Sequence, residues 1–239
     1  MSQRLANPHA LLPAAAGGIT AVDVPRLRLK WAYGLPQEQQ ARGQPAVIGG
    51  RLFVGSQAGA VYALDAKSGD VLWTTRSFPA ESRRVLTGAP RAADGKVFIG
   101  HGGADFGNRG YVDAFDAKSG EPLWRFHTVP GDPSDGFENK AMEMAAKTWH
   151  GQWWKEGGGG TVWNAITYDP ELDLVYLGVG NGDPWDYDRR SEGKGDNLFL
   201  CSIVALRADT GEYVWHYQMN PGEQWDYKAT ADIILTDLT

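Results

Sequence analysis

The sequence predicts an all-β fold built from repeated units, and three observations lead to this prediction. An eleven-residue pattern occurs three times, and the 239 residues include 31 glycines and ten tryptophans. Tight turns at glycine, with large aromatic side chains packed beside them, are typical of all-β repeat proteins. A chain of this length is also ample for a buried core.

The repeated pattern places Ala, then Ser or Thr, then Gly, then Trp at fixed offsets. Its three copies run from Ala63 to Trp73, from Ala114 to Trp124 and from Ala205 to Trp215. In each copy an apolar strand leads into a tight turn that ends at the glycine, and a second strand contains the tryptophan. Self-similarity of this kind indicates a repeat architecture.

The residues upstream of the first copy complete the unit. Residues 45–48 and 52–54 are apolar and flank a Gly49-Gly50 turn, which predicts two further strands. Four antiparallel strands in each unit define a propeller blade. A β-sandwich with repetitive turns is the alternative, although sandwiches rarely repeat an eleven-residue signature. We therefore expect a partial β-propeller with about three complete four-stranded blades plus partial blades.

The repeat also suggests the domain boundaries. We expect a poorly ordered N-terminal segment over 1–25 and one propeller domain over 26–239, interrupted by an excursion at 130–160. Residues 138–149 in that excursion have a helix-forming composition. The blades are expected at 44–79, 88–129 and 161–219, with a lone outer strand at 26–34 and the first strand of another blade at 229–236.

Composition and charge argue against several other classes of protein. The net charge is −6 and the basic residues are scattered, so we expect no nucleic-acid partner. Cys201 is the single cysteine, which rules out an internal disulfide and leaves no Cys/His cluster for zinc or haem attachment. No stretch reaches the about 18 apolar residues of a membrane span. The N-terminal residues lack the apolar region of a signal peptide.

The polar residues of interest are expected on one face of the propeller. In each blade, the loop between the second and third strands lies on the same face as the link to the next blade. Long loops in a compact repeat protein usually carry function. This face receives Asp105 and Asn181 from the loops, and Thr87, Thr161, Trp163 and Asp226 from the links.

Six segments on or near this face resemble the quinoprotein alcohol and methanol dehydrogenases, which use pyrroloquinoline quinone (PQQ). The resemblance is nearly continuous from about 85 to 237, whereas residues 1–80 resemble the family only as a generic repeat. The segments are TGAP at 87–90, GGADFGNRG at 102–110, GGGGTVW at 157–163, GVGNGDPW at 178–185, GDNL at 195–198, and WHYQ at 215–218 followed by QWDY at 224–227.

The resemblance implies a PQQ site, a Ca²⁺ site and a catalytic base. Trp163 would be the floor on which the quinone stacks, and Asp226 would be the base. Ca²⁺ prefers carboxylate and amide oxygens, and a carboxylate beside it can take the proton of an alcohol. The implied contacts are Thr87, Gly102, Ala104 and Thr161 with PQQ, and Asp105, Asn181 and Asp226 with Ca²⁺.

Other interpretations of these residues stay open. Trp163 is also compatible with a core position, Asn181 with a simple turn, and Asp226 with an ordinary loop carboxylate. Two residues differ from the family's usual pattern: Asp105 stands where a glutamate is common, and Lys228 stands where some relatives carry an additional carboxylate for a lanthanide.

The function implied by the resemblance is the PQQ- and Ca²⁺-dependent oxidation of alcohols to aldehydes. Electrons would pass to cytochrome c or another separate acceptor, in the periplasm. The family's ring continues for several blades beyond Thr239, so we also expect self-association of this chain. The alternative is a non-catalytic PQQ-repeat propeller that serves as a protein-binding scaffold.

Overall fold

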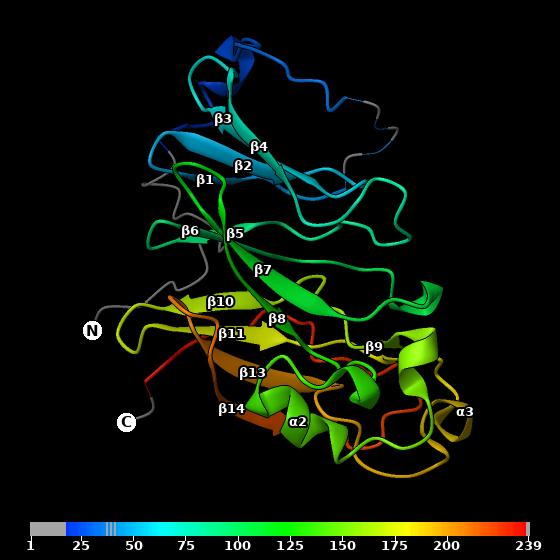
Figure 1. Ribbon diagram of the computed structural model, residues 1–239. Coiled ribbons are helices and arrows are strands. Elements are labelled where there is room, and N and C mark those ends of the chain that lie inside the picture. Colours follow the sequence, from blue (N-terminus) through cyan, green and yellow to red (C-terminus); the bar gives the residue numbers. More distant parts are fainter. Residues whose placement is uncertain (1–17, 37, 39, 41, 238–239) are drawn as a thin grey trace.

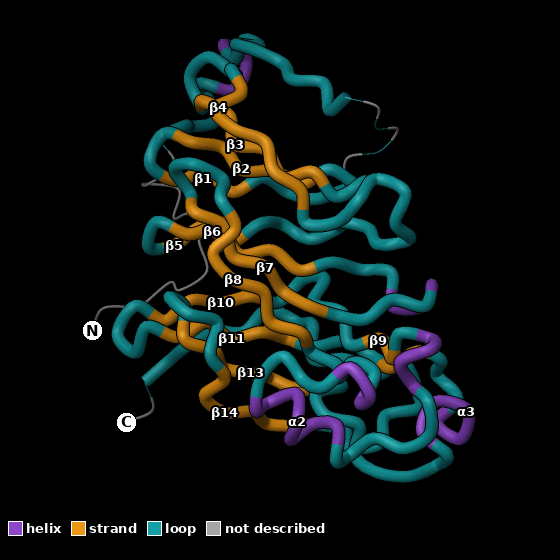
Figure 2. Tube along the Cα trace, in the orientation of Figure 1, coloured by secondary structure: helices purple, strands orange, loops and turns teal. Residues whose placement is uncertain are grey.

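Three four-stranded sheets follow one another along the molecule (Figure 1, Figure 2). The computed structural model describes residues 18–36, 38, 40 and 42–237. In each sheet the strands follow in chain order and pair antiparallel with their neighbours. This confirms the predicted β-propeller class and its three complete blades.

The first sheet contains β1 (Ala46–Ile48), β2 (Arg51–Gly55), β3 (Ala60–Asp65) and β4 (Val71–Arg76). The second contains β5 (Arg91–Ala93), β6 (Lys96–Gly100), β7 (Tyr111–Asp116) and β8 (Pro122–His127). The third contains β10 (Ile166–Asp169), β11 (Leu174–Gly178), β13 (Ser202–Arg207) and β14 (Tyr213–Gln218).

Shorter elements lie in the loops. They are the helices α2 (Lys140–Ala146) and α3 (Tyr187–Ser191), the 3₁₀-helices η1 (Val24–Arg26), η2 (Ala104–Phe106), η3 (Pro133–Asp135) and η4 (Trp153–Glu156), and the paired strands β9 (Gly158–Gly159) and β12 (Gly182–Asp183). Helix α2 confirms the helix expected at 138–149. Its first turn is capped by Asn139, whose side-chain oxygen accepts from Met142 N at 3.0 Å.

The core lies between the sheets. Between the first and second sheets, the buried side chains include Phe53 of β2 and Phe115 of β7. Between the second and third, they include Phe98 of β6 and Leu177 of β11. The third strand of each blade is nearly continuous in its burial, whereas the outer strands β4, β8 and β14 are largely exposed. Sheets pack on both sides of β7, but the outer side of β3 is covered by the segment of Trp31 and that of β13 by the segment of Ile233.

The repeated Trp and Gly join each blade to the next. Trp124 of β8 donates from Nε1 to Ala208 O of the third blade at 2.9 Å. A Cβ placed on Gly211, whose φ is +71°, would lie 2.6 Å from the Trp124 ring. The glycine therefore serves two purposes: it allows the left-handed turn and it leaves room for the indole. The same arrangement joins Trp73 to Ala117 and Gly120, and Trp31 to Ala66 and Gly69.

Two expected strands are wrong. Residues 26–34 form no strand, although Trp31 packs against the first blade as an outer-strand tryptophan does. Residues 229–236 also form none, and side chains of the third blade hold this segment, with Thr167 Oγ1 donating to Ile233 O at 2.9 Å. A strand requires a partner with free backbone groups, and neither segment has one among the described residues.

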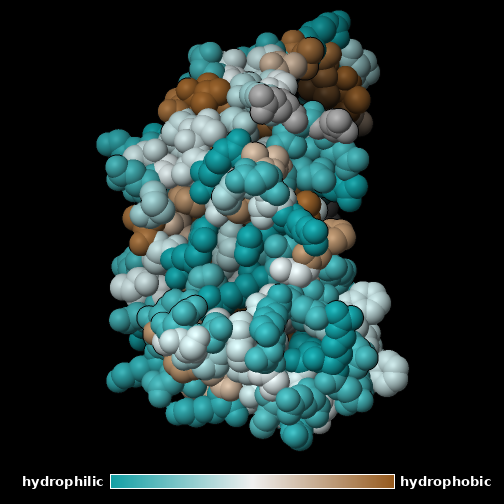
Figure 3. Space-filling view, turned by 45° about the vertical axis from the view of Figure 1, so that its right-hand side comes forward, coloured by the Kyte–Doolittle hydropathy of each residue, from teal (hydrophilic) through white to brown (hydrophobic). Residues whose placement is uncertain are grey.

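Most of the segment expected to be poorly ordered, residues 1–17, lies outside the described residues; its later part contains η1. Hydrophobic side chains gather at the upper end of the molecule (Figure 3). The exposed hydrophobic residues near the N-terminus include Leu27 and Leu29, which are 56% and 85% exposed. Self-association through such surfaces stays a prediction. In the described part of the chain, no helix is both long and apolar enough to cross a membrane.

We predict that Trp124→Ala lowers the free energy of unfolding by roughly 3 kcal/mol, because a packed indole and its hydrogen bond are lost together. Trp124→Phe should cost about 1 to 2 kcal/mol, since a smaller ring still packs but the hydrogen bond is gone. Trp215→Phe is the matched control, because Trp215 occupies the same place in the repeat but is 41% exposed. Urea unfolding measures all three. Equal losses at 124 and 215 would contradict the role of the blade-to-blade contact.

Candidate functional site

The candidate site lies on the face formed by the loops between second and third strands and by the links between blades. In Figure 1 this face is at the right, where β9 and α3 lie. The second blade contributes the loop 101–110, and the third contributes the loop 179–201. The placement on one face follows the prediction, because blade topology sends these loops in the same direction.

A run of four glycines joins the two loops. Residues 157–160 have φ angles of +82°, +77°, +80° and +68°, a region that side chains disfavour. On one side Gly110 N donates to Gly159 O at 2.8 Å, and on the other β9 pairs with β12. A Cβ on Gly159 would lie 2.6 Å from Asn181 O. The loops can approach this closely only because the strand between them has no side chains.

Asp105 and Asn181, two predicted metal ligands, are brought together by this arrangement. Asn181 Nδ2 donates to Asp105 Oδ1 at 3.3 Å, although the residues are 76 positions apart. Asp105 lies in η2 and is exposed, whereas Asn181 is 4% exposed. Trp185 Nε1 also donates to Asp105 Oδ1, at 3.0 Å, and thereby fixes the carboxylate. A carboxylate and an amide side by side make a polar pair suited to a cation.

The surroundings of this pair are acidic. Asp183 Oδ2 accepts from Gly107 N at 3.1 Å. Burial, followed by the charges of Asp105 and Glu156, raises the pKa of Asp183 to about 6. The negative potential that disfavours ionisation of Asp183 would favour a bound cation.

The predicted quinone-binding residues also lie together. A Cβ on Gly102 would lie 3.4 Å from Thr87 Oγ1 and 3.6 Å from Trp163 Cβ. A Cβ on Gly180 would lie 3.7 Å from both Thr161 Oγ1 and Trp163 Nε1. Trp163 is therefore beside two glycines and near two threonine hydroxyls.

The burial of these residues bears on the core interpretation of Trp163. Thr161 and Ala104 are 1% and 5% exposed, whereas Trp163 is only half-buried. An indole that is half-buried beside glycines differs from the buried tryptophans of the core, such as Trp73. The arrangement is suited to a planar ligand, which can stack where no side chain intervenes.

Asp226 is less closely connected to the other predicted residues. Its φ is +59°, and its Oδ1 accepts from Lys228 Nζ at 2.8 Å. Among the hydrogen bonds of the described residues, none joins Asp226 to Asn181. The predicted three-residue metal set is thus represented by one close pair and a third residue in a neighbouring loop.

Two buried charged residues at this face carry no sequence signal that would have identified them. Glu223 is 0% exposed and Arg190 is 1% exposed, and Arg190 Nη2 donates to Glu223 O. Glu223 lies in an irregular loop and Arg190 in the five-residue helix α3, and neither stretch is long enough for a periodic pattern to predict burial. The nearest clue was that Glu223 stands three positions before Asp226.

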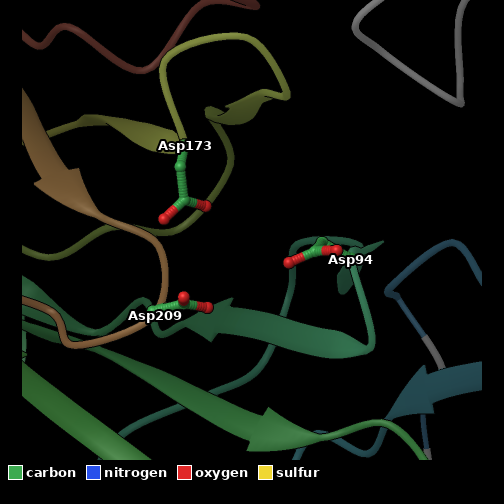
Figure 4. A group of neighbouring side chains, drawn as sticks. All are labelled: Asp94, Asp173 and Asp209. Atoms are coloured by element: carbon green, nitrogen blue, oxygen red, sulfur yellow. The ribbon is translucent and has the colours of Figure 1, made fainter.

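A separate group of three aspartates lies on the opposite face, in the turns of the second and third blades. Oxygens of Asp94, Asp173 and Asp209 lie within 4.8 Å of one another (Figure 4). Lys96 already pairs with two of them, at 2.9 Å to Asp94 and 2.5 Å to Asp209. This group therefore contains its own cation and does not belong to the candidate site.

A buried histidine supports the wall of the site. His101 is 0% exposed and precedes Gly102, whose carbonyl accepts from its Nδ1 at 2.9 Å. Burial lowers the pKa of His101 to about 3. Burial and the charge of Arg109 lower the pKa of His127, in the same cluster, to about 4. Both rings are therefore neutral in the folded protein at neutral pH.

Comparisons with known proteins agree on one family. The model of the glucose/ethanol/alcohol dehydrogenase β-propeller domain, a PQQ family, matches residues 80–239. The quinohemoprotein alcohol dehydrogenase ADH-IIG of Pseudomonas putida is 51% identical over 231 residues, which cover 92% of this chain and 32% of that protein.

Solved structures give the same result. The quinohemoprotein alcohol dehydrogenase of Comamonas testosteroni superimposes with a TM-score of 0.78 at 50% identity, covering 81% of this chain and 29% of that one. A europium-containing methanol dehydrogenase superimposes with a TM-score of 0.77 at 35% identity, covering 88% and 39%. The chain thus spans about a third of the length of the curated relatives it matches.

We predict that acid destabilises the protein partly through His101. Above its ordinary pKa of about 6.5 the ring is neutral in both the folded and unfolded states. As the pH falls from about 6.5 towards 3, only the unfolded state gains the proton, so stability is lost by up to about 1.4 kcal/mol per pH unit. Asparagine does not titrate, so His101→Asn should make the free energy of unfolding fall less steeply between pH 6 and 4 by roughly this amount.

Urea unfolding at several pH values measures this difference in slope. His150→Asn is the control, because His150 is exposed and solvent reaches it in both states. Parallel pH profiles for the wild type and His101→Asn would contradict the prediction.

Proposed function

The chain belongs to the β-propeller family of glucose, ethanol and alcohol dehydrogenases, and from this premise we propose that its candidate site serves PQQ- and Ca²⁺-dependent oxidation of alcohols to aldehydes. The observation that supports the proposal most strongly is the position of Trp163. Its half-buried indole lies beside two glycines and near two threonine hydroxyls. The adjoining loops carry the pair formed by Asp105 and Asn181.

The residues fit a planar quinone. Glycine at 102 and 180 leaves the surroundings of the indole open, because a Cβ at either position would contact Trp163 or a threonine. Thr87 and Thr161 offer hydroxyl groups that can donate to ring oxygens or nitrogens. Ala104, at the start of η2, adds a small buried side chain at the same wall.

The donor set also fits Ca²⁺. Asp105 supplies a carboxylate. A 180° rotation of the Asn181 side-chain amide would exchange its two ends, so that Oδ1 takes the place from which Nδ2 now donates to Asp105. A divalent cation there would relieve the repulsion between Asp105 and Asp183. The ammonium group of Lys228 forms an ion pair with Asp226 and thereby offsets the negative charge of this carboxylate, which a trivalent ion would need as a ligand. We therefore propose Ca²⁺ and not a lanthanide.

Asp226 is proposed as the base and as a further metal ligand. When bound, PQQ would supply the electron-accepting carbonyl, and Ca²⁺ would supply a Lewis acid to polarise it. Lys228 holds Asp226 Oδ1, which leaves Oδ2 to accept the proton of the alcohol hydroxyl. Family resemblance alone supports two further proposals, a separate electron acceptor such as cytochrome c and a periplasmic location.

We predict that PQQ quenches the tryptophan fluorescence of the chain saturably when Ca²⁺ is present. Trp163→Phe should weaken PQQ binding by about tenfold, because stacking on the larger indole contributes about 1 to 3 kcal/mol for a planar heterocycle. Trp215→Phe is the matched control on an outer strand. Unchanged PQQ affinity in Trp163→Phe would remove this residue from the site.

The same titration distinguishes the metals. We expect Ca²⁺ to support tighter PQQ binding than La³⁺, because of the Lys228 charge. Lys228→Gln should reduce the difference in PQQ affinity between the two metals. Tighter binding with La³⁺ in the wild type would contradict the choice of Ca²⁺.

In the active enzyme, Asp226→Asn should lower turnover by about 10²–10⁴-fold, since the amide cannot accept the alcohol proton. Steady-state dye reduction measures turnover, and the fluorescence titration checks that PQQ still binds. Asp188→Asn, an exposed residue of α3, is the control. Turnover equal to that of the wild type would exclude Asp226 as the base.

A further inference from the structure

Glu223 connects the two loops that carry the proposed base and the buried metal ligand. Its Oε1 accepts from Trp225 N at 2.6 Å and from Tyr227 N at 2.9 Å. Its Oε2 accepts from Gly182 N at 3.1 Å. Each carboxylate oxygen therefore holds a different loop, and the side chain is fully buried.

The positions of these three amides relate directly to the proposed chemistry. Trp225 and Tyr227 flank Asp226, and Gly182 follows Asn181. Asp226 has a φ of +59°, which is unfavourable for a residue with a side chain. Two hydrogen bonds to the same oxygen, one on each side of Asp226, hold the backbone in this conformation. The direction of the Asp226 side chain is set by that backbone.

Burial of the neighbouring side chains cannot hold the backbone of Asp226 in this conformation. Trp225 and Tyr227 are 69% and 59% exposed, so their loop gains little from packing. Asp226 is bonded to Lys228 within the same loop. The contacts of Glu223 are thus a direct link between this loop and the loop of Asn181.

Arg190 makes a buried carboxylate possible at this place. It is 1% exposed and donates to Pro184 O at 2.7 Å and to Asn197 Oδ1 at 3.1 Å, as well as to Glu223 O. A buried anion is costly unless it is hydrogen-bonded and neutralised by a nearby charge. A Cβ on Gly182 would lie 2.5 Å from the Arg190 guanidinium, so the loop packs directly on this cation.

We propose that Glu223 is a positioning residue, which fixes Asp226 relative to Asn181 by binding the backbone of both loops. The functional part of this inference depends on the roles proposed above for Asp226 and Asn181. A carboxylate is required because both oxygens must accept at once, Oε1 from the Asp226 loop and Oε2 from the Asn181 loop. Glutamine has the same shape but only one accepting oxygen, so Glu223→Gln should release one loop while it preserves the fold.

Amide hydrogen exchange tests the link between the loops in the chain without any ligand. In Glu223→Gln we expect exchange to accelerate by about tenfold or more at Gly182, or at both Trp225 and Tyr227, depending on which loop faces the new NH₂ group. Glu212→Gln, an exposed residue in the turn before β14, is the control. Unchanged exchange at all three amides would overturn the proposal.

A second measurement separates positioning from a general loss of structure. With PQQ present, the Ca²⁺ concentration that gives half-maximal fluorescence quenching should rise by about tenfold in Glu223→Gln. The quenching at saturating Ca²⁺ and the thermal unfolding midpoint should stay close to those of the wild type. Faster exchange with an unchanged Ca²⁺ requirement would overturn the positioning role.

Failure of the proposed function gives a different result. If the wild-type chain shows no Ca²⁺-dependent quenching, the PQQ and Ca²⁺ proposal is contradicted. The exchange rates in Glu223→Gln then still decide whether this residue holds the two loops together.

Discussion

The site depends on one physical constraint, the close approach of backbone to backbone on both sides of Gly159. Its carbonyl accepts from Gly110 in the second blade, and its strand pairs with Gly182 and Asp183 in the third. A side chain at 159 would lie 2.6 Å from Asn181 O, so any other residue would force the two loops apart. Asn181 Nδ2 lies 3.3 Å from Asp105 Oδ1 because this glycine strand joins their two loops.

Glycine makes the same kind of contact where neighbouring blades meet. A Cβ on Gly88 would lie 2.2 Å from Trp163 O, and a Cβ on Gly100 would lie 1.9 Å from Val162 O. These contacts fix the backbone that carries Trp163. On the outer strands, Trp73 and Trp124 join the blades through their indole rings. The blades are thus held together at two distances from the axis, and the proposed quinone site lies at the glycine-rich inner one.

Much of the fold could be predicted because its signals are local. The blades are predicted from Trp and Gly residues a few positions apart, and the helix from the composition of residues 138–149 alone. Blade topology then places the loops on one face. The strands expected at 26–34 and 229–236 fail because strand formation depends on a partner. Glu223 and Arg190 escaped prediction because their burial arises from the packing of three loops. Sequence likewise offers no measure of how far Asp226 lies from Asn181.

We propose that the glycine-rich face between the second and third blades binds PQQ beside a cation. A crystal structure of the chain grown with PQQ and Ca²⁺ tests it most directly. The expected result is a quinone stacked on the Trp163 indole, with Ca²⁺ coordinated by Asp105 and the Asn181 oxygen. A quinone bound elsewhere, or Ca²⁺ found at Asp94, Asp173 and Asp209 and not at Asp105, would contradict it.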